Sequence, residues 1–180
     1  MRRKVSGFLI LLGVAMAALV SPAAAQDLLT ITGKVGATNR PAYDPFRDAF
    51  FKHHEVQFNT AYALDRTALS ALPQKEVRAH VEGWPRIIAA KGPLLRDVLA
   101  AAKVADGARL MVMALDGYAA ELEPNDLTAH EWIVAIEADG RPLGVGGRGP
   151  AWLMYDTGGK TIPGDSEAKW VWSAFLITAE

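Results

Sequence analysis

The chain of 180 residues contains no cysteine. Without a thiol it can form no disulfide, no iron–sulfur cluster, no Cys-ligated metal site and no thiolate nucleophile. A domain without disulfides must be stabilised by its hydrophobic core alone. Chemistry that depends on sulfur atoms of cysteine side chains is therefore excluded.

The chain also has little excess charge, with 19 Lys and Arg against 20 Asp and Glu. Three of the basic residues, Arg2, Arg3 and Lys4, lie at the extreme N-terminus. The remainder is mildly acidic and contains no basic stripe, whereas proteins that bind nucleic acids usually carry one. We therefore expect no nucleic-acid partner.

Long apolar runs are scarce, and the clearest one lies close to the N-terminus. An uncharged stretch from Gly7 to Val20 follows the basic residues, and Ala23-Ala24-Ala25 supplies a small-residue cleavage site. The stretch is shorter than the roughly 20 residues that a transmembrane helix needs. The pattern predicts a signal peptide over residues 1–25, with cleavage after Ala25 and a periplasmic or secreted location. No transmembrane span is expected in residues 26–180.

Several motifs of catalysis and cofactor binding are missing as well. There is no G-x-S-x-G sequence, and the four histidines (His53, His54, His80 and His130) have none of the spacings typical of a metal site, so we predict no metal. The segment Gly144–Gly149 matches G-x-G-x-x-G. However, Pro150 and an apolar strand follow it, where a dinucleotide-binding fold requires a helix. The loop is either a plain glycine-rich turn or a site that holds an anion through its backbone amides and Arg148.

The remaining pattern predicts many short strands and a few short helices. Apolar alternation and apolar runs indicate strands at Leu28–Thr32, Glu55–Tyr62, Glu76–Val81, Arg109–Leu115, Tyr118–Leu122, Trp132–Ala138, Ala151–Tyr155 and Trp170–Thr178. Asp139-Gly140 is typical of a tight hairpin after one of them. Helices are expected after three signals: Asp44-Pro45, Asp65 and Gly92-Pro93. Hairpins mixed with short helices indicate one α+β domain over residues 26–180, with a mixed or antiparallel sheet.

Tryptophans are frequent in the predicted strands. Trp170 and Trp172 are expected on one face of their strand because side chains alternate along it. Trp132 and Trp152 lie on other apolar strands. These rings either belong to the core or line a cleft for a planar ligand.

Several segments, taken in order, resemble one known family. They are Gly92-Pro93-Leu94-Leu95-Arg96-Asp97-Val98-Leu99, Asp116-Gly117-Tyr118, Ala138-Asp139-Gly140-Arg141-Pro142-Leu143, Arg148-Gly149-Pro150, Pro163-Gly164 and Lys169-Trp170. The family is the sulfite-oxidase-type molybdopterin-binding domain, and the resemblance extends from Leu28 to Ile177. It implies that fold, with molybdopterin as cofactor and oxo transfer as activity.

The chain departs from this family where the family's chemistry resides. In the family enzymes a cysteine after a strand like Glu76–Val81 ligates molybdenum, and this chain has Ala79-His80-Val81-Glu82-Gly83-Trp84 there. A missing ligand normally disables a metal site. We therefore expect an exported, non-catalytic domain of this fold that binds a small, anionic ligand or a periplasmic or membrane protein partner. The alternative is a molybdopterin-dependent oxidoreductase that retains its cofactor without a cysteine ligand.

The resemblance also suggests where a ligand would bind. The matching segments supply six candidate residues: Asp116, Tyr118, Arg148, Trp152, Tyr155 and Lys169. Arg148 and Lys169 would favour an anion, Asp116 would orient one of them, and the rings would form a flat wall. The segment from Gly36 to Leu64 has no counterpart in the resemblance. Its many aromatic residues are expected to cover a sheet face, with a partner site as the alternative.

Overall fold

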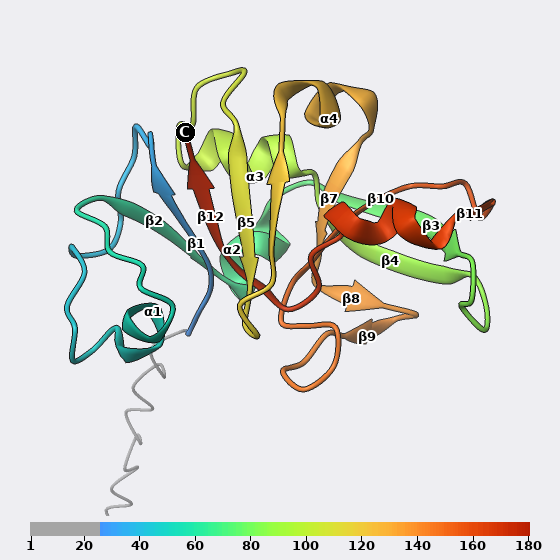
Figure 1. Cartoon of the computed structure of the whole chain (residues 1–180), viewed down its shortest axis with the longest axis horizontal. Helices are drawn as coiled ribbons and strands as arrows, with labels where there is room; N and C mark the ends of the chain where they lie inside the picture. Colours follow the sequence, from blue (N-terminus) through green and yellow to red (C-terminus); the bar gives the residue numbers. More distant parts are fainter. Residues whose placement is uncertain (1–25) are drawn as a thin grey trace, which may run out of the picture.

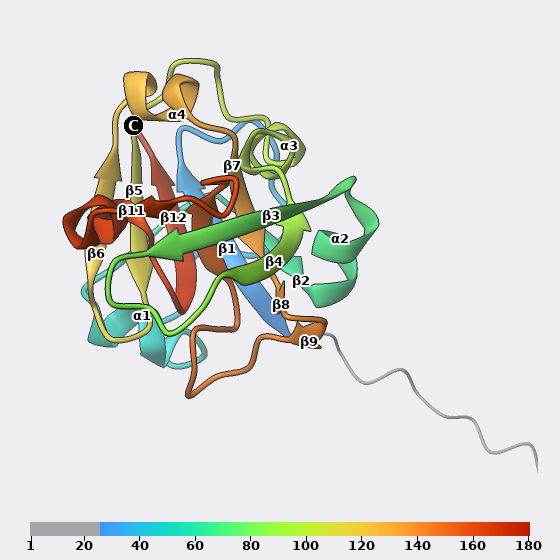
Figure 2. The same cartoon turned by 90° about the vertical axis from the view of Figure 1, so that its right-hand side faces the viewer.

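Residues 26–180 are described by the computed structural model, and the predicted signal peptide at residues 1–25 lies outside the described residues. Figure 1 shows two sheets side by side, joined by a short strand pair. Figure 2 views the same arrangement from the side of the second sheet. None of the helices in residues 26–180 is long and apolar enough to cross a membrane.

The first sheet contains both the first and the last strand of the described chain. Its order is β2-β1-β12-β5-β6, and its strands are β1 (Asp27–Gly33), β2 (Ala61–Asp65), β5 (Leu110–Ala114), β6 (Ala119–Leu122) and β12 (Ala174–Ala179). Strand β1 is parallel to β12, and the other neighbours are antiparallel. The sheet is therefore mixed, as the sequence predicts.

The second sheet has the order β11-β3-β4-β8-β9, and strands β7 and β10 form a separate antiparallel pair. These strands are β3 (Gln74–Val81), β4 (Ile88–Pro93), β7 (Trp132–Ala135), β8 (Glu137–Ala138), β9 (Arg141–Pro142), β10 (Trp152–Tyr155) and β11 (Thr161–Ile162). Strand β4 passes so close to β7 that a Cβ atom on Gly92 would overlap the Val134 carbonyl oxygen. Only glycine fits at this crossing.

The helices are short, and side chains cap the N-termini of α2 and α4. They are α1 (Ala49–His53), α2 (Arg66–Ala71), α3 (Leu95–Ala101), α4 (Pro124–Ala129) and the 3₁₀ helix η1 (Gly164–Lys169). Asp65 caps α2, since its carboxylate accepts a hydrogen bond from the Ala68 amide at 2.6 Å. Glu123 and Asp126 form a capping box at the start of α4, which the sequence analysis missed.

One core cluster joins all the sheets. Its largest fully buried side chains include Leu29, Ile31, Leu110, Ile133 and Trp152. Four consecutive residues of β7 are buried, because β7 packs between the two sheets rather than at a surface. The structure confirms a single α+β domain with short helices.

The aromatic insertion from Gly36 to Leu64 covers the outer face of the first sheet. Phe51 packs edge-on against Phe58, with ring centroids 5.3 Å apart, and lies 5.4 Å from Phe175 of β12. Phe58 and Phe175 are both buried. The covering role is therefore confirmed by these contacts.

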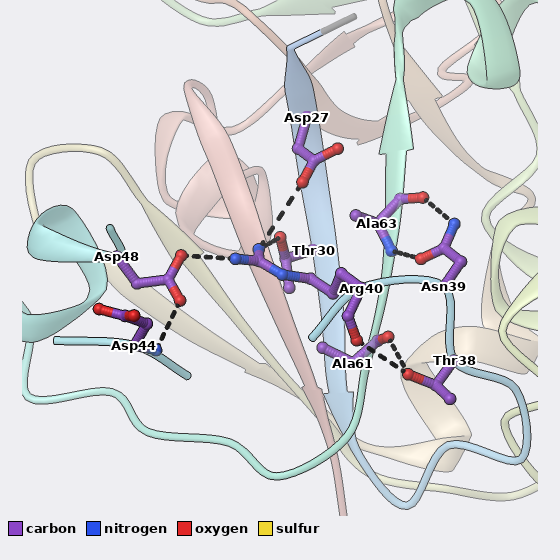
Figure 3. Close-up of polar contacts among 9 residues, drawn as sticks. All are labelled: Asp27, Thr30, Thr38, Asn39, Arg40, Asp44, Asp48, Ala61 and Ala63. Carbon is purple, nitrogen blue, oxygen red and sulfur yellow. Dashed lines mark hydrogen bonds and ion pairs between the residues drawn. The ribbon is translucent and has the colours of Figure 1, made fainter. Parts of the chain in front are cut away.

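Polar side chains fasten the part of the insertion that precedes β2 to β1 and β2 (Figure 3). Arg40 donates to Asp48 at 2.5 Å and to Thr30 of β1 at 3.0 Å. Asn39 makes a two-way pair with the backbone of Ala63, at 2.8 Å and 2.7 Å. These bonds fix the insertion on the strands that it covers.

Two predictions about this insertion are wrong. Residues 55–60 form no strand, and β2 begins only at Ala61, because Phe58 turns inward to the aromatic cluster instead of joining a ladder. Helix α1 begins after Asp48 and not after Asp44. Asp44 caps only a turn, accepting hydrogen bonds from the amides of Phe46 and Arg47.

The strands near the C-terminus also differ from the prediction. The predicted strand Trp132–Ala138 is split into β7 and β8, with Ile136 between them. The predicted strand Trp170–Thr178 begins only at Ala174, because η1 ends at Lys169 and an irregular segment follows. Trp170 is consequently buried whereas Trp172 is 45% exposed, so these rings do not share an environment. Strands β4 and β11 were not predicted.

Candidate functional site

Residues 168–173, which comprise the end of η1 and the irregular segment before β12, connect several of the predicted site residues. The Tyr118 hydroxyl donates a hydrogen bond to the Ala168 carbonyl. The Ser173 amide donates to the Arg148 carbonyl at 2.9 Å, and the Leu115 amide donates to the Ser173 carbonyl at 3.0 Å. The β5–β6 turn and the glycine-rich loop therefore both lie along this segment.

The glycine-rich loop is held in place by Ser173. The hydroxyl of this buried serine is within hydrogen-bonding distance of the carbonyls of Gly147 (3.1 Å) and Gly149 (2.8 Å). A Cβ atom on Gly149 would lie 2.6 Å from the Leu143 carbonyl carbon, so the close approach at this position requires glycine. The loop leads into Pro150 and β10 rather than into a helix, which does not fit a dinucleotide-binding loop.

Arg148 extends from this loop across two tryptophan rings. Its guanidinium carbon lies 4.6 Å from the ring centroid of Trp152 and 4.9 Å from that of Trp84. Both distances are within the range of a cation–π interaction. The side chain is exposed, and no ion pair to it exists within residues 26–180. The rings thus orient a guanidinium whose charge has no protein counter-ion in the described chain.

A continuous row of aromatic rings runs inward from Arg148. Trp84 lies 5.6 Å from Trp152, Trp152 lies 6.3 Å from Trp170, and Trp170 lies 4.9 Å from Tyr155. Tyr155 stacks on His130 with centroids 3.8 Å apart and planes 5° apart. Burial raises the pKa of the Tyr155 phenol, so it is neutral at physiological pH.

Lys169 takes part in an ion pair of its own. Its Nζ lies 2.5 Å from Asp126 Oδ2, and the Lys169 hydrogen bond lowers the pKa of that carboxyl. Asp126 also accepts from the Glu123 amide within the α4 capping box. The charge of Lys169 is therefore already compensated, which distinguishes it from Arg148.

Asp116 stabilises a turn instead of orienting Arg148 or Lys169. Its carboxylate accepts a hydrogen bond from the Tyr118 amide at 3.0 Å, within the β5–β6 turn. Gly117 has a φ of +89°, which completes that turn. Of the six candidates, the structure thus brings Arg148 and Trp152 into direct contact and places Tyr155 in the same aromatic row. Asp116, Tyr118 and Lys169 contact other parts of the molecule.

The site also contains rings that the sequence analysis did not select. Trp84 lies after β3, at the position where the family resemblance places the metal-ligand loop. The family resemblance at that position could have been used to select Trp84 as a site residue. His130, which stacks on Tyr155, had no sequence signal, because only the fold brings the end of α4 against β10.

None of the six candidates lines either of two cavities that lie elsewhere among the described residues. One, of about 610 Å³, lies between α3 and α4, and the other, of about 700 Å³, lies between the insertion and the ends of β1 and β12. Arg148 itself is exposed, so the site that it forms lies at the surface.

Comparison with solved structures identifies the fold of this chain. No family model matches the sequence, and no curated protein sequence matches it. The crystal structure of the sulfane dehydrogenase SoxCD from Paracoccus pantotrophus superposes with a TM-score of 0.58 at 15% identity. SoxCD is related to the sulfite-oxidase-like proteins. The chain has the sulfite-oxidase-type fold.

The likeness is one of fold, and it extends over part of the larger protein. The superposition covers 85% of this chain and 38% of the SoxCD chain. This chain therefore spans well under half the length of that relative.

The residues where a family metal ligand would lie do not form a molybdenum-ligating set. Both ring nitrogens of His80 are engaged, Nδ1 with the Thr161 hydroxyl at 2.8 Å and Nε2 with the Trp84 carbonyl at 3.3 Å. Trp84 itself packs against Trp152 and under Arg148. No soft thiolate is available, and an imidazole held in this way is a poor replacement.

Proposed function

We propose that the protein is an exported, non-catalytic domain of the sulfite-oxidase-type fold that binds a small oxyanion at Arg148. The observation that carries this proposal is the uncompensated guanidinium held over Trp84 and Trp152. An arginine side chain presents five N–H donors in a planar fork, which matches the oxygen atoms of a carboxylate, sulfate or phosphate. Stacking on two rings limits the conformational freedom that binding would otherwise remove.

The surrounding loop supports the same ligand class. Gly146 and Gly147 are exposed beside Arg148, and such glycine-rich backbone can direct amide groups at an anion. Lys169, by contrast, is paired with Asp126 and adds no free positive charge. The proposal therefore assigns anion recognition to Arg148 alone.

The non-catalytic part of the proposal rests on the donor atoms available. The sequence has no cysteine, and the His80 nitrogens already have hydrogen-bonding partners. Export through the general secretory route, which threads an unfolded chain, would also deliver this domain without a cofactor inserted beforehand. The predicted signal peptide is thus consistent with a domain that works without molybdopterin.

Intrinsic tryptophan fluorescence offers a direct test, because Arg148 lies against two indole rings. We expect titration with sulfate, phosphate or acetate to change the emission of the purified protein. Arg148→Ala should weaken binding of the best anion about tenfold or more, since a charge-assisted hydrogen bond is lost. Arg141→Ala, on exposed strand β9, is the matched control and should bind normally. Equal affinity of Arg148→Ala and the unmodified protein would overturn the proposal.

The likeness to a sulfane dehydrogenase favours one alternative, a molybdopterin-dependent oxidoreductase without a cysteine ligand. Metal analysis and the absorption spectrum of protein purified from its native periplasm distinguish the two. Stoichiometric molybdenum together with a pterin chromophore would replace the non-catalytic proposal with this alternative.

Exposed aromatic side chains favour a second alternative, a protein partner in the periplasm or membrane. Phe46 is 90% exposed on the insertion, and Trp172 is exposed beside β12. Co-purification from periplasmic and membrane extracts would test it. A partner that is retained by the unmodified protein and lost with Phe46→Ser would support this reading over a small ligand.

A further inference from the structure

A cavity of about 610 Å³ lies between α3, the loop that follows α3, and α4. Its size falls within the roughly 300–1,000 Å³ of typical small-molecule sites. Most of its lining is apolar, including Leu94, Leu99, Val104, Leu127 and Trp132. This cavity is separate from the proposed Arg148 site, and the inference below does not depend on that site.

The aromatic wall of the cavity suits an apolar ligand. The indole N–H of Trp132 already donates to the Asp126 carbonyl at 2.9 Å, so the ring presents no unpaired donor to a bound molecule. Leu99 on α3 and Leu127 on α4 are both only half-buried, although each packs against the core cluster. A hydrocarbon chain between the two helices would bury apolar surface that now faces water.

One end of the cavity carries surplus positive charge. Glu131 forms a close ion pair with Lys75, while its other oxygen lies 3.5 Å from the Arg96 guanidinium. One carboxylate thus faces two cations, and the Arg96 side chain is 68% exposed. Arg96 therefore has N–H donors that Glu131 does not use and that can bind a second carboxylate at the cavity mouth.

The other charged groups of the lining do not cancel this surplus at the same end. Asp106 follows the C-terminal end of α3, whereas Arg96 lies at its beginning, so the length of the helix, about 10 Å, separates them. His130 lies in the same wall as Glu131, with its ring stacked on Tyr155. The cavity consequently extends about 10 Å along α3, and Arg96 lies at its positively charged end.

We propose that this cavity binds an amphipathic monocarboxylate of medium chain length. The hydrocarbon chain lies between α3 and α4, against Leu99, Leu127 and Trp132. The carboxylate is bound by Arg96 at the end of the cavity that Glu131 also faces. No covalent step is involved, so the site acts by binding alone.

Calorimetric titration of the purified protein with hexanoate, octanoate and decanoate tests the apolar part. Affinity should rise about three- to fourfold per added methylene until the cavity is filled, because each buried methylene contributes a similar transfer free energy. Leu99→Trp, which narrows the cavity, should remove the rise in affinity with chain length. Leu72→Trp places the same ring on a half-buried leucine after α2 and should leave binding intact. Affinity independent of chain length would overturn the proposal.

Octanol, which has the same chain without the charge, tests the role of Arg96. Arg96→Gln should lower octanoate affinity about tenfold and leave octanol affinity unchanged, since only the carboxylate loses its charge-assisted hydrogen bond. Equal effects on both ligands, or none, would overturn the assignment to Arg96. Arg96 is exposed, so this substitution is informative even if Leu99→Trp fails to fold.

The Arg148 site must be separated from this cavity in the same experiment. Arg148→Ala should leave octanol binding and the rise in affinity with chain length unchanged, because Arg148 does not line the cavity. If Arg148→Ala abolished octanoate binding while Leu99→Trp preserved the rise in affinity with chain length, the carboxylate site would be at Arg148 and the cavity proposal would fail. Loss of sulfate or phosphate binding in Arg148→Ala would support the proposed function and would not test the cavity proposal.

Discussion

A double-mutant cycle between Arg148 and Trp84 tests the geometry on which the proposed anion site depends. The guanidinium carbon lies 4.9 Å from Trp84 and 4.6 Å from Trp152. Because Arg148 is exposed, each contact should contribute about 0.5–1 kcal/mol. Arg148→Ala should therefore lower the free energy of unfolding by about 1–2 kcal/mol, through the loss of both contacts.

The cycle isolates one of these contacts. Trp84→Leu alone also loses packing against Trp152, so its effect on stability cannot be assigned directly to Arg148. The coupling free energy between Arg148→Ala and Trp84→Leu removes that contribution and should be about 0.5–1 kcal/mol. Urea denaturation of the four proteins, followed by circular dichroism, gives the required free energies.

A control cycle combines Arg141→Ala with Trp84→Leu, because Arg141 lies on exposed strand β9. Its coupling to Trp84 should be zero within error. A coupling of zero for Arg148 itself, with every variant folded, would refute the stacked geometry. The anion proposal would then lose the observation that supports it.

Two further predictions concern the packing and the charges around the site. Gly92→Ala should destabilise the fold by about 3 kcal/mol in thermal or urea unfolding, because its Cβ would overlap the Val134 carbonyl oxygen; a loss below about 1 kcal/mol would contradict the close crossing of β4 and β7. Lys169→Met should destabilise the protein by at most about 1 kcal/mol at neutral pH, since the ion pair with Asp126 is partly exposed to solvent. The Lys169 hydrogen bond lowers the pKa of Asp126 in the folded state, so its stabilisation is present above the unfolded pKa and is lost as the pH falls through the folded one. Stability curves of Lys169→Met and the unmodified protein should therefore converge once the pH has fallen below the folded-state pKa of Asp126, and a gap that persists there would exclude the ion pair as its cause.

Local patterns were most informative where one face of a strand or helix meets the core. Val77, Ala79 and Val81 alternate along β3 and are buried, so period-two alternation gave the correct strand. The same pattern failed at residues 55–60, where Phe58 packs into the aromatic cluster of the insertion. Strand β4 was missed, because Ile88–Pro93 contains Lys91, Gly92 and Pro93 and lacks a regular apolar pattern.

The candidate site was predicted in part. Arg148 was selected from a motif that matches the family, and Trp152 and Tyr155 from the strand that follows it. All three lie in or beside the aromatic row. Trp84 was not selected, because nothing in its local sequence indicates that the loop after β3 meets the glycine-rich loop. Lys169 was selected as a free cation, because its pairing with Asp126 depends on how α4 packs against η1.

By itself, the sequence determined the α+β class, the absence of any cysteine ligand and the position of most strands. These properties follow from composition and from short-range periodicity, which act within a few residues. Only the tertiary structure decided which charges are free and which rings meet. Arg148 rests on Trp84 and Trp152, whereas Lys169 is neutralised by Asp126, because those contacts join segments that are distant in the chain. The difference between an arginine stacked on two rings and an ion-paired lysine is therefore a property of the fold.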